Sequence, residues 1–292
     1  MPRTETNPHA LDIGGQAVIE GVLMKSGQKL AIAVRLDDGG IRVRRETIRR
    51  LPKLLRLPLV RGVATLFFIL ILGIKALVWS ANQSLKKDEE LSTLELAVTL
   101  FTSLIVATVV FVGVPFAVTK LIRLTGFWFN VVEGAIRLAL FVGYVSAISF
   151  MRDIRRLFQY HGAEHMAVNC YEFSEPLTVK NVAKYSTIHP RCGTSFIMLV
   201  LLITIVLYSF ISTEIWYAKL LWRIALIPVV AGLSYEVLRL GGRFRGSRAM
   251  RSLVAPGMWV QRITTQKPDK GMIEVAIRAL KAVTGKEKNT RS

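Results

Sequence analysis

The chain has 292 residues, 52% of them hydrophobic, with a mean hydropathy of +0.42 and a formal net charge of +19. This composition excludes an ordinary soluble domain, because several stretches approach the ~18–20 apolar residues that a helix needs to cross a bilayer. A charge of this size suits nucleic acid, but the Lys and Arg of membrane proteins gather in cytoplasmic segments that face anionic lipid. We therefore expect contacts with membrane lipids and no specific DNA recognition.

Short β-compatible runs open the chain, within a predicted N-terminal segment of residues 1–61. They are residues 16–24, 30–35 and 41–45. Residues 37–40 form a strong turn signal, and the run after them alternates apolar with basic side chains. The pattern predicts a small sheet of two or three strands. Residues 42–61 carry eight basic residues and one acid, which is typical of a cytoplasmic juxtamembrane segment.

Five apolar stretches follow, and each is a candidate for crossing the membrane. They are residues 62–81, 94–119, 127–151, 196–212 and 220–240. The third contains Glu133 and Arg137, which stand in the favourable order for an ion pair along a helix. Because a charge at mid-bilayer costs roughly 2.5–3.5 kcal/mol, we expect these two residues to neutralise each other inside the bundle.

The distribution of basic residues predicts the topology. Basic blocks occur at residues 42–61, 152–156 and 239–251, and we expect all three in the cytoplasm. The connections 120–126 and 213–219 carry only two and one basic residues, so they are the translocated candidates. An even number of crossings must then separate the first two blocks. We assign residues 62–81 as interfacial or re-entrant, because Lys75 interrupts this stretch.

The predicted fold is therefore mainly α: a polytopic membrane protein with about four transmembrane helices and a small N-terminal β element. Residues 152–195 form a cytosolic segment, and both termini are expected in the cytoplasm. Residues 241–292 form a basic cytosolic segment with an amphipathic helix. Its apolar positions at helical spacing are Met272, Ile273, Ala276, Ile277 and Leu280.

The cytosolic segment 152–195 holds three of the chain's four histidines. His161 and His165 stand four residues apart, so on a helix their imidazoles share one face. With Glu164 they form H-x-x-E-H, the inverzincin arrangement in which two His bind zinc and the Glu acts as general base. The pattern predicts a site for zinc or another divalent transition metal.

A catalytic zinc site needs a third protein ligand, and a structural site needs a fourth. His189 and Cys192 are the candidates, because imidazole and thiolate are both good zinc ligands. Two alternatives remain: interfacial histidines with a small buried thiol, and a nucleophilic Cys192 activated by a His. If the metal interpretation holds, the ligand atoms should converge to within roughly 3–5 Å of one another, with Glu164 facing the same point.

Five strings carry a resemblance to a known family. They are GGQAVIEGV at 14–22, FQYHGAEH at 158–165, HPRCGTSF at 189–196, SYEV at 234–237 and APG at 255–257. At these residues the sequence resembles the YqhQ family, bacterial integral membrane proteins of unknown function that are often labelled predicted metal-dependent enzymes. The resemblance covers nearly the whole chain from Gly14 to about Val283, and it implies a location in the bacterial inner membrane.

The resemblance adds residues to the candidate site. Glu20 belongs to the first string and is implied as a base or a ligand, and Glu236 in the fourth string has the same standing. Arg191 is implied as a bidentate donor to an anionic group. Met166 stands where the family suggests a basic residue, and Cys170 where it suggests a small one.

Two functions from different classes follow from these observations. The first is a membrane-embedded, zinc-dependent hydrolase whose site opens at the cytosolic face, acting on a peptide bond near the membrane or a lipid-linked ester. The alternative is a non-enzymatic assembly factor or scaffold with a structural metal site or none. Its basic surface would bind membrane-insertion machinery, the ribosome or anionic lipid. A transporter ranks lowest, because four spans are few and no internal repeat is apparent.

Overall fold

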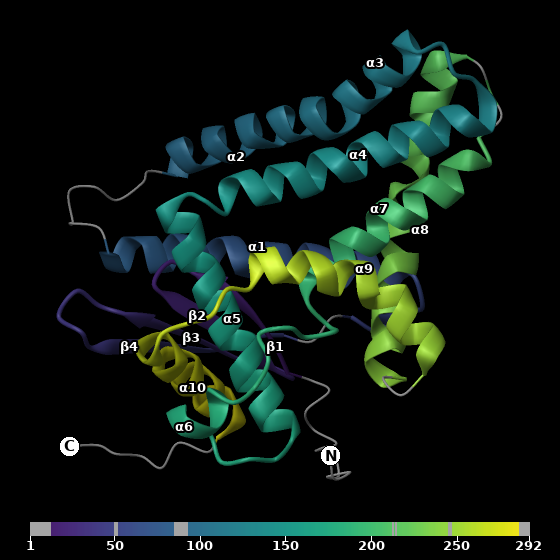
Figure 1. Ribbon diagram of the computed structural model, residues 1–292. Coiled ribbons are helices and arrows are strands. Elements are labelled where there is room, and N and C mark those ends of the chain that lie inside the picture. The colour runs from purple at the N-terminus through teal and green to yellow at the C-terminus, as the bar shows by residue number, and fades with distance from the viewer. Residues whose placement is uncertain are drawn as a thin grey trace.

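Figure 1 shows the computed structural model of the protein, which describes residues 13–49, 52–84, 93–211, 213, 215–244 and 247–285. Both chain ends lie outside these residues. The prediction that the termini are cytoplasmic therefore also lies outside the described residues. The strands are β1 (Ile13–Val18), β2 (Gly21–Ser26), β3 (Lys29–Arg35) and β4 (Ile41–Thr47). The helices are η2 (Lys53–Arg56), α1 (Val60–Ser84), α2 (Thr93–Thr108), η4 (Val109–Gly113), α3 (Val114–Leu121), α4 (Gly126–Ile148), α5 (Arg152–Glu172), α6 (Val179–Val182), α7 (Gly193–Ser209), α8 (Trp216–Arg243), α9 (Arg248–Thr264) and α10 (Lys270–Thr284).

The four strands form one antiparallel sheet in the order β1-β2-β3-β4. This is one strand more than the most that the sequence predicts, because its pattern indicates a single strand over residues 16–24. The chain turns within that run at Glu20, whose φ of 51° lies in the left-handed region. The turn allows β1 and β2 to pair as a hairpin, with Val18 opposite Gly21.

The central strands β2 and β3 are buried on both faces of the sheet. Helices α5 and α10 cover one face, where Val22 and Met24 pack with the helices' apolar side chains. Helix α1 covers the other face, where Ile32 and Ala76 belong to one cluster. The near-continuous apolar runs of β2 and β3 follow from this double burial. The amphipathic helix predicted in the C-terminal segment is α10, and its five expected apolar positions are all buried.

Within the described part of the chain, four helices are long and apolar enough to cross a membrane. They are Val60–Gln83, Ala97–Leu121, Gly126–Ile148 and Trp216–Gly241. The number agrees with the prediction, but the set differs. The stretch that we expected not to cross has the length and hydropathy of a span, whereas the stretch 196–212 forms α7, a helix of 17 residues. Whether residues 62–81 cross stays a prediction.

A polar cluster ties the apolar helices together. Glu133 and Arg137 of α4 form the expected ion pair, and Arg223 of α8 places Nη1 3.4 Å from the same carboxylate. Arg137 Nε also donates to the carbonyl of Phe111, at 2.9 Å, in the π-helical turn η4. A π-helical turn interrupts the regular i→i−4 pattern, so it exposes a backbone acceptor for a cation inside the bundle.

Candidate metal centre

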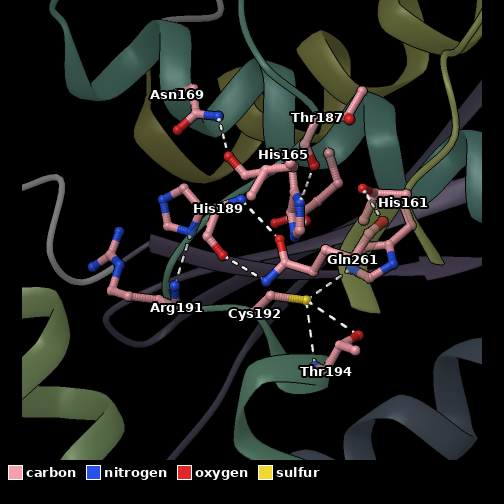
Figure 2. A network of polar contacts seen from close by, with 12 residues as sticks. His161, His165, Asn169, Thr187, His189, Arg191, Cys192, Thr194 and Gln261 are labelled. Carbon is pink, nitrogen blue, oxygen red and sulfur yellow. Dashed lines mark hydrogen bonds and ion pairs between the residues drawn. The ribbon is translucent and has the colours of Figure 1, made fainter. Parts of the chain in front are cut away.

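Helix α5 places His161 and His165 on one face, as predicted, with their ring centroids 4.5 Å apart. Gly162 lies between them, and a Cβ at this position would overlap the carbonyl oxygen of Gln266. This glycine therefore allows the segment after α9 to pass directly against α5. Its close approach brings the end of α9 next to the two histidines, as the close-up in Figure 2 shows for Gln261.

Cys192 approaches the histidines from the start of α7. Its Sγ lies 3.2 Å from His161 Nε2, and one ligand atom from each of His161, His165 and Cys192 lies within 4.8 Å of the others. Cys192 is the N-cap of α7, where its sulfur accepts a hydrogen bond from the N–H of Thr194 at 3.4 Å. A helix N-terminus favours negative charge, and a thiolate is the form that binds metals.

Both histidines are oriented by backbone carbonyls. Nδ1 of His161 lies 2.9 Å from the carbonyl oxygen of Thr264, and Nδ1 of His165 lies 2.5 Å from that of Thr187. A carbonyl only accepts, so each Nδ1 carries the proton and each Nε2 keeps its lone pair. Metal-binding histidines usually have this second interaction, which fixes the ring and its tautomer. Burial lowers the pKa of His161, which further favours the neutral ring.

Glu164 lies beside the same point, on the side of α5 that faces the sheet. Its Oε2 is 3.4 Å from His165 Nε2, and the residue is only 5% exposed. Burial raises the pKa of its carboxyl group to about 7, although the nearby His161 and Arg191 act in the opposite direction. The side chain packs over Gly15 of β1, where a Cβ would stand 2.6 Å from Oε1. Gly15 of the first string thus leaves space for this carboxylate.

His189 does not join the three ligand atoms, contrary to one of the two predicted choices. Its ring lies 5.7 Å from that of His165, but Nε2 donates to Glu172 at 3.3 Å and Nδ1 accepts from the N–H of Arg191 at 3.3 Å. Both ring nitrogens are therefore occupied by protein groups. Burial lowers the pKa of His189 to about 4, so the ring is neutral at pH 7.

Gln261 is a member of the site that the sequence did not reveal. It is fully buried, and its amide accepts from the N–H of His189 at 2.9 Å while donating to the carbonyl of His189 at 2.9 Å and to Ser195 Oγ at 2.8 Å. These bonds fix the loop that carries Cys192 to helix α9 (Figure 2). The one signal in the sequence was indirect: Gln261 follows Gly257 of the APG string by one helical turn.

Two other predicted residues, Glu20 and Glu236, take part in separate interactions. Glu20 pairs with Arg156 and accepts a hydrogen bond from Tyr160 at 3.2 Å, so its carboxylate serves the β1–β2 turn and the start of α5. Glu236 of α8 makes two bonds, of 2.7 and 2.6 Å, with the guanidinium of Arg61 on α1. Neither carboxylate belongs to the converging group of His161, His165 and Cys192.

Arg191 lies next to the centre and holds Glu172 in an ion pair. The same Glu172 oxygen accepts from His189, so Arg191 and His189 share one acceptor. The predicted role of Arg191 toward an anionic substrate group stays a prediction, because its guanidinium has a protein carboxylate as a partner in this structure.

The geometry limits the chemistry of the cluster. A metal ion would use all three converging atoms, and two imidazole nitrogens with one thiolate form a donor set that suits zinc. A nucleophilic thiol would use only the 3.2 Å contact between Cys192 and His161. That alternative gives no role to His165, whose ring is 3% exposed and is held by a backbone carbonyl as that of His161 is. The donor set therefore fits a metal better than a thiol nucleophile.

Comparison with known proteins agrees with the family resemblance and adds no activity. A family model described as "Protein of unknown function (DUF1385)" matches residues 57–286. The chain is also similar to the uncharacterized protein YqhQ of Bacillus subtilis (strain 168), with 35% identity over 285 residues, which cover 90% of this chain and 89% of that protein. No solved structure matches the chain.

Proposed function

We propose that this protein, which belongs to the DUF1385 family, is a zinc-dependent hydrolase held at a membrane surface. The observation that carries the proposal is the convergence of His161, His165 and Cys192 beside the carboxylate of Glu164. Three protein ligands leave one position of a tetrahedral zinc ion open, which is the arrangement of catalytic rather than structural sites.

The zinc ion would supply Lewis acidity and lower the pKa of a water molecule at its open position. The protein's own groups perform the remaining tasks. His161 and His165 present their Nε2 atoms because their Nδ1 protons are held by carbonyls. Glu164 stands within reach to accept a proton, and its buried setting raises its basicity toward neutral pH.

The packing of the sheet against α5 supports a location of the metal centre on the same side of the membrane as the basic segments. The sheet packs against α5, so the N-terminal strands and the metal centre lie on the same side of any membrane. Three apolar helices lie between the sheet and α5 in the sequence: α1, the continuous α2–η4–α3, and α4. An even number of membrane crossings must therefore connect the sheet to α5, so either one or all three of these helices do not cross. Helix α1 fits this role, because Ala76 and Ser80 are fully buried and Ser80 Oγ accepts from the N–H of Ile19 at 3.2 Å. This favours the cytosolic face predicted from the charges.

The burial of the cluster favours a second function, that of an assembly factor or scaffold with a structural metal. His165 and Cys192 are 3% and 6% exposed, and their union with His161 ties α5 to the start of α7. A metal in this place would stabilise the junction between α5 and the apolar helix α7. Docking of membrane-insertion machinery or the ribosome to the basic surface would then be the function.

Glu164→Gln separates the two functions, because it removes the base and nearly keeps the shape. Zinc content and the hydrolysis of a panel of ester and peptide substrates are measured on wild type and variant purified in detergent. A hydrolase keeps its zinc in the variant and loses roughly 10²–10⁴-fold in rate. Equal rates in the two proteins, or no hydrolysis by zinc-loaded wild type, contradict the hydrolase. Recovery of a salt-labile partner by both proteins then supports the scaffold.

A further inference from the structure

A cavity of about 260 Å³ opens at the far end of the apolar helices from the metal centre. It lies where the connection from α3 to α4 meets the first turn of α8, at the upper right of Figure 1. Helix α7 separates the two places, since it starts at Cys192 and its 17 residues extend about 25 Å. The cavity is therefore a separate feature, and nothing in the proposed hydrolase uses it.

The lining of this cavity is cationic. Lys120, Arg123 and Lys219 contribute three positive charges, and none of the described lining residues is acidic. Lys219 is only 4% exposed, and its ammonium lies 4.4 Å from the centre of the Phe129 ring. Lys120 and Arg123 are exposed, and their side chains form no ion pair with a described residue. Such a concentration of positive charge attracts an anion.

Two helix N-termini add to the positive potential. Thr125, the N-cap of α4, and Trp216, the first residue of α8, both line the cavity. Neither N-cap side chain accepts a hydrogen bond from the first turn of its helix, and the first N–H groups of any α-helix have no acceptor within that helix. Helix N-termini bind phosphate through these groups and through the helix dipole.

The surroundings indicate an amphiphilic anion. Trp216 lines the cavity and is 60% exposed. Trp128 and Tyr217, each next in sequence to a lining residue, are 64% and 61% exposed, as expected for aromatic residues at a membrane–water boundary. Leu121, at the end of α3, is 82% exposed. Phe116 and Phe129 form an apolar wall beside the cations. A ligand with phosphate among the cations and acyl chains along the exposed apolar helices matches both parts of the surface.

We propose that this cavity binds the phosphate of an anionic phospholipid headgroup, such as that of phosphatidylglycerol. Lys120 and Arg123 contact the phosphate, and Lys219 with Phe129 forms the floor of the site. On the topology predicted from charge, these residues lie on the side of the membrane opposite the metal centre. The protein would then hold a specific lipid on one face and its metal on the other.

Native mass spectrometry of the full chain in detergent tests the proposal, with dioleoylphosphatidylglycerol, dioleoylphosphatidylcholine and inorganic phosphate as separate probes. The variant is Lys120→Gln with Arg123→Asn, because Asn tolerates the φ of 62° at position 123. The control is Lys180→Gln with Lys184→Gln, which removes the same charge from exposed positions near α6. Far-UV circular dichroism checks the fold, and Lys120→Gln alone replaces the double variant if that one fails to fold.

Wild type and control should retain phosphatidylglycerol in preference to phosphatidylcholine. The double variant should bind it at least about tenfold more weakly, and Lys120→Gln alone about threefold more weakly. Equal binding of the two lipids, or unchanged binding in the variants, overturns the proposal. Displacement of phosphatidylglycerol by millimolar inorganic phosphate, with no preference for the lipid, assigns the cavity to a soluble anion and overturns the lipid assignment.

Discussion

Gln261→Ala should destabilise the protein more than the removal of any other side-chain amide near the candidate metal centre. The substitution deletes three hydrogen bonds of 2.8–2.9 Å to His189 and Ser195 in a fully buried place. An unsatisfied buried donor or acceptor costs about 1–3 kcal/mol, and the partners of Gln261 become unsatisfied together. We therefore expect a loss of about 3–5 kcal/mol in the free energy of unfolding.

The substitution should also lower the affinity for zinc, because Gln261 fixes the loop that presents Cys192. Removal of such a supporting partner typically costs 10–100-fold in metal affinity. Chemical unfolding in detergent with a chelator measures the stability, and competition with a zinc indicator measures the affinity. The matched control is Gln159→Ala, which deletes one 3.3 Å bond to the carbonyl of Lys267 at an exposed place and should change stability by less than about 0.5 kcal/mol. A loss below about 1 kcal/mol with unchanged zinc affinity would refute this reasoning.

Two further predictions follow from the packing of α5 and its neighbours. Between pH values of about 6.5 and 4 the unfolded chain binds a proton at His189 that the folded chain excludes, so stability falls as the pH falls through this window. The loss summed over this window is about 3 kcal/mol, and His189→Gln should remove it, so that stability depends less on pH there; an unchanged pH dependence contradicts the burial argument. Gly162→Ala should lower stability by about 1–3 kcal/mol, because its Cβ meets the backbone of Gln266. Gly143→Ala, which meets nothing within 4 Å in α4, should be neutral or stabilising, and equal effects of the two substitutions would contradict the packing.

The sequence contained the part of the site that depends on local spacing. The four-residue interval between His161 and His165 determines that both rings share a face, whatever the tertiary structure. Whether His189 or Cys192 joins the two histidines depends instead on Glu172, which lies 17 residues before His189 and accepts a hydrogen bond from its ring. Gln261 carried no local signal, because a glutamine on a helix is usually an exposed residue.

The fold was predictable to a similar depth. Apolar length and charge identified the helices, but composition does not distinguish a helix that faces lipid from one that covers a sheet. Helix α1 shows this ambiguity, because Leu72 and Ala76 would be apolar in either setting. The turn at Glu20 was missed for a related reason: a non-glycine residue with positive φ has no sequence signature of its own.

Zinc stoichiometry is the most direct test of the central claim. Elemental analysis of the purified chain, reconstituted with zinc and freed of excess, should give about one ion per protein for wild type. Cys192→Ala and His165→Ala should lose the ion, whereas His189→Gln should keep it, because only the first two contribute atoms to the converging cluster. Zinc-free wild type with an intact fold would contradict the account, as would retention by Cys192→Ala together with loss by His189→Gln.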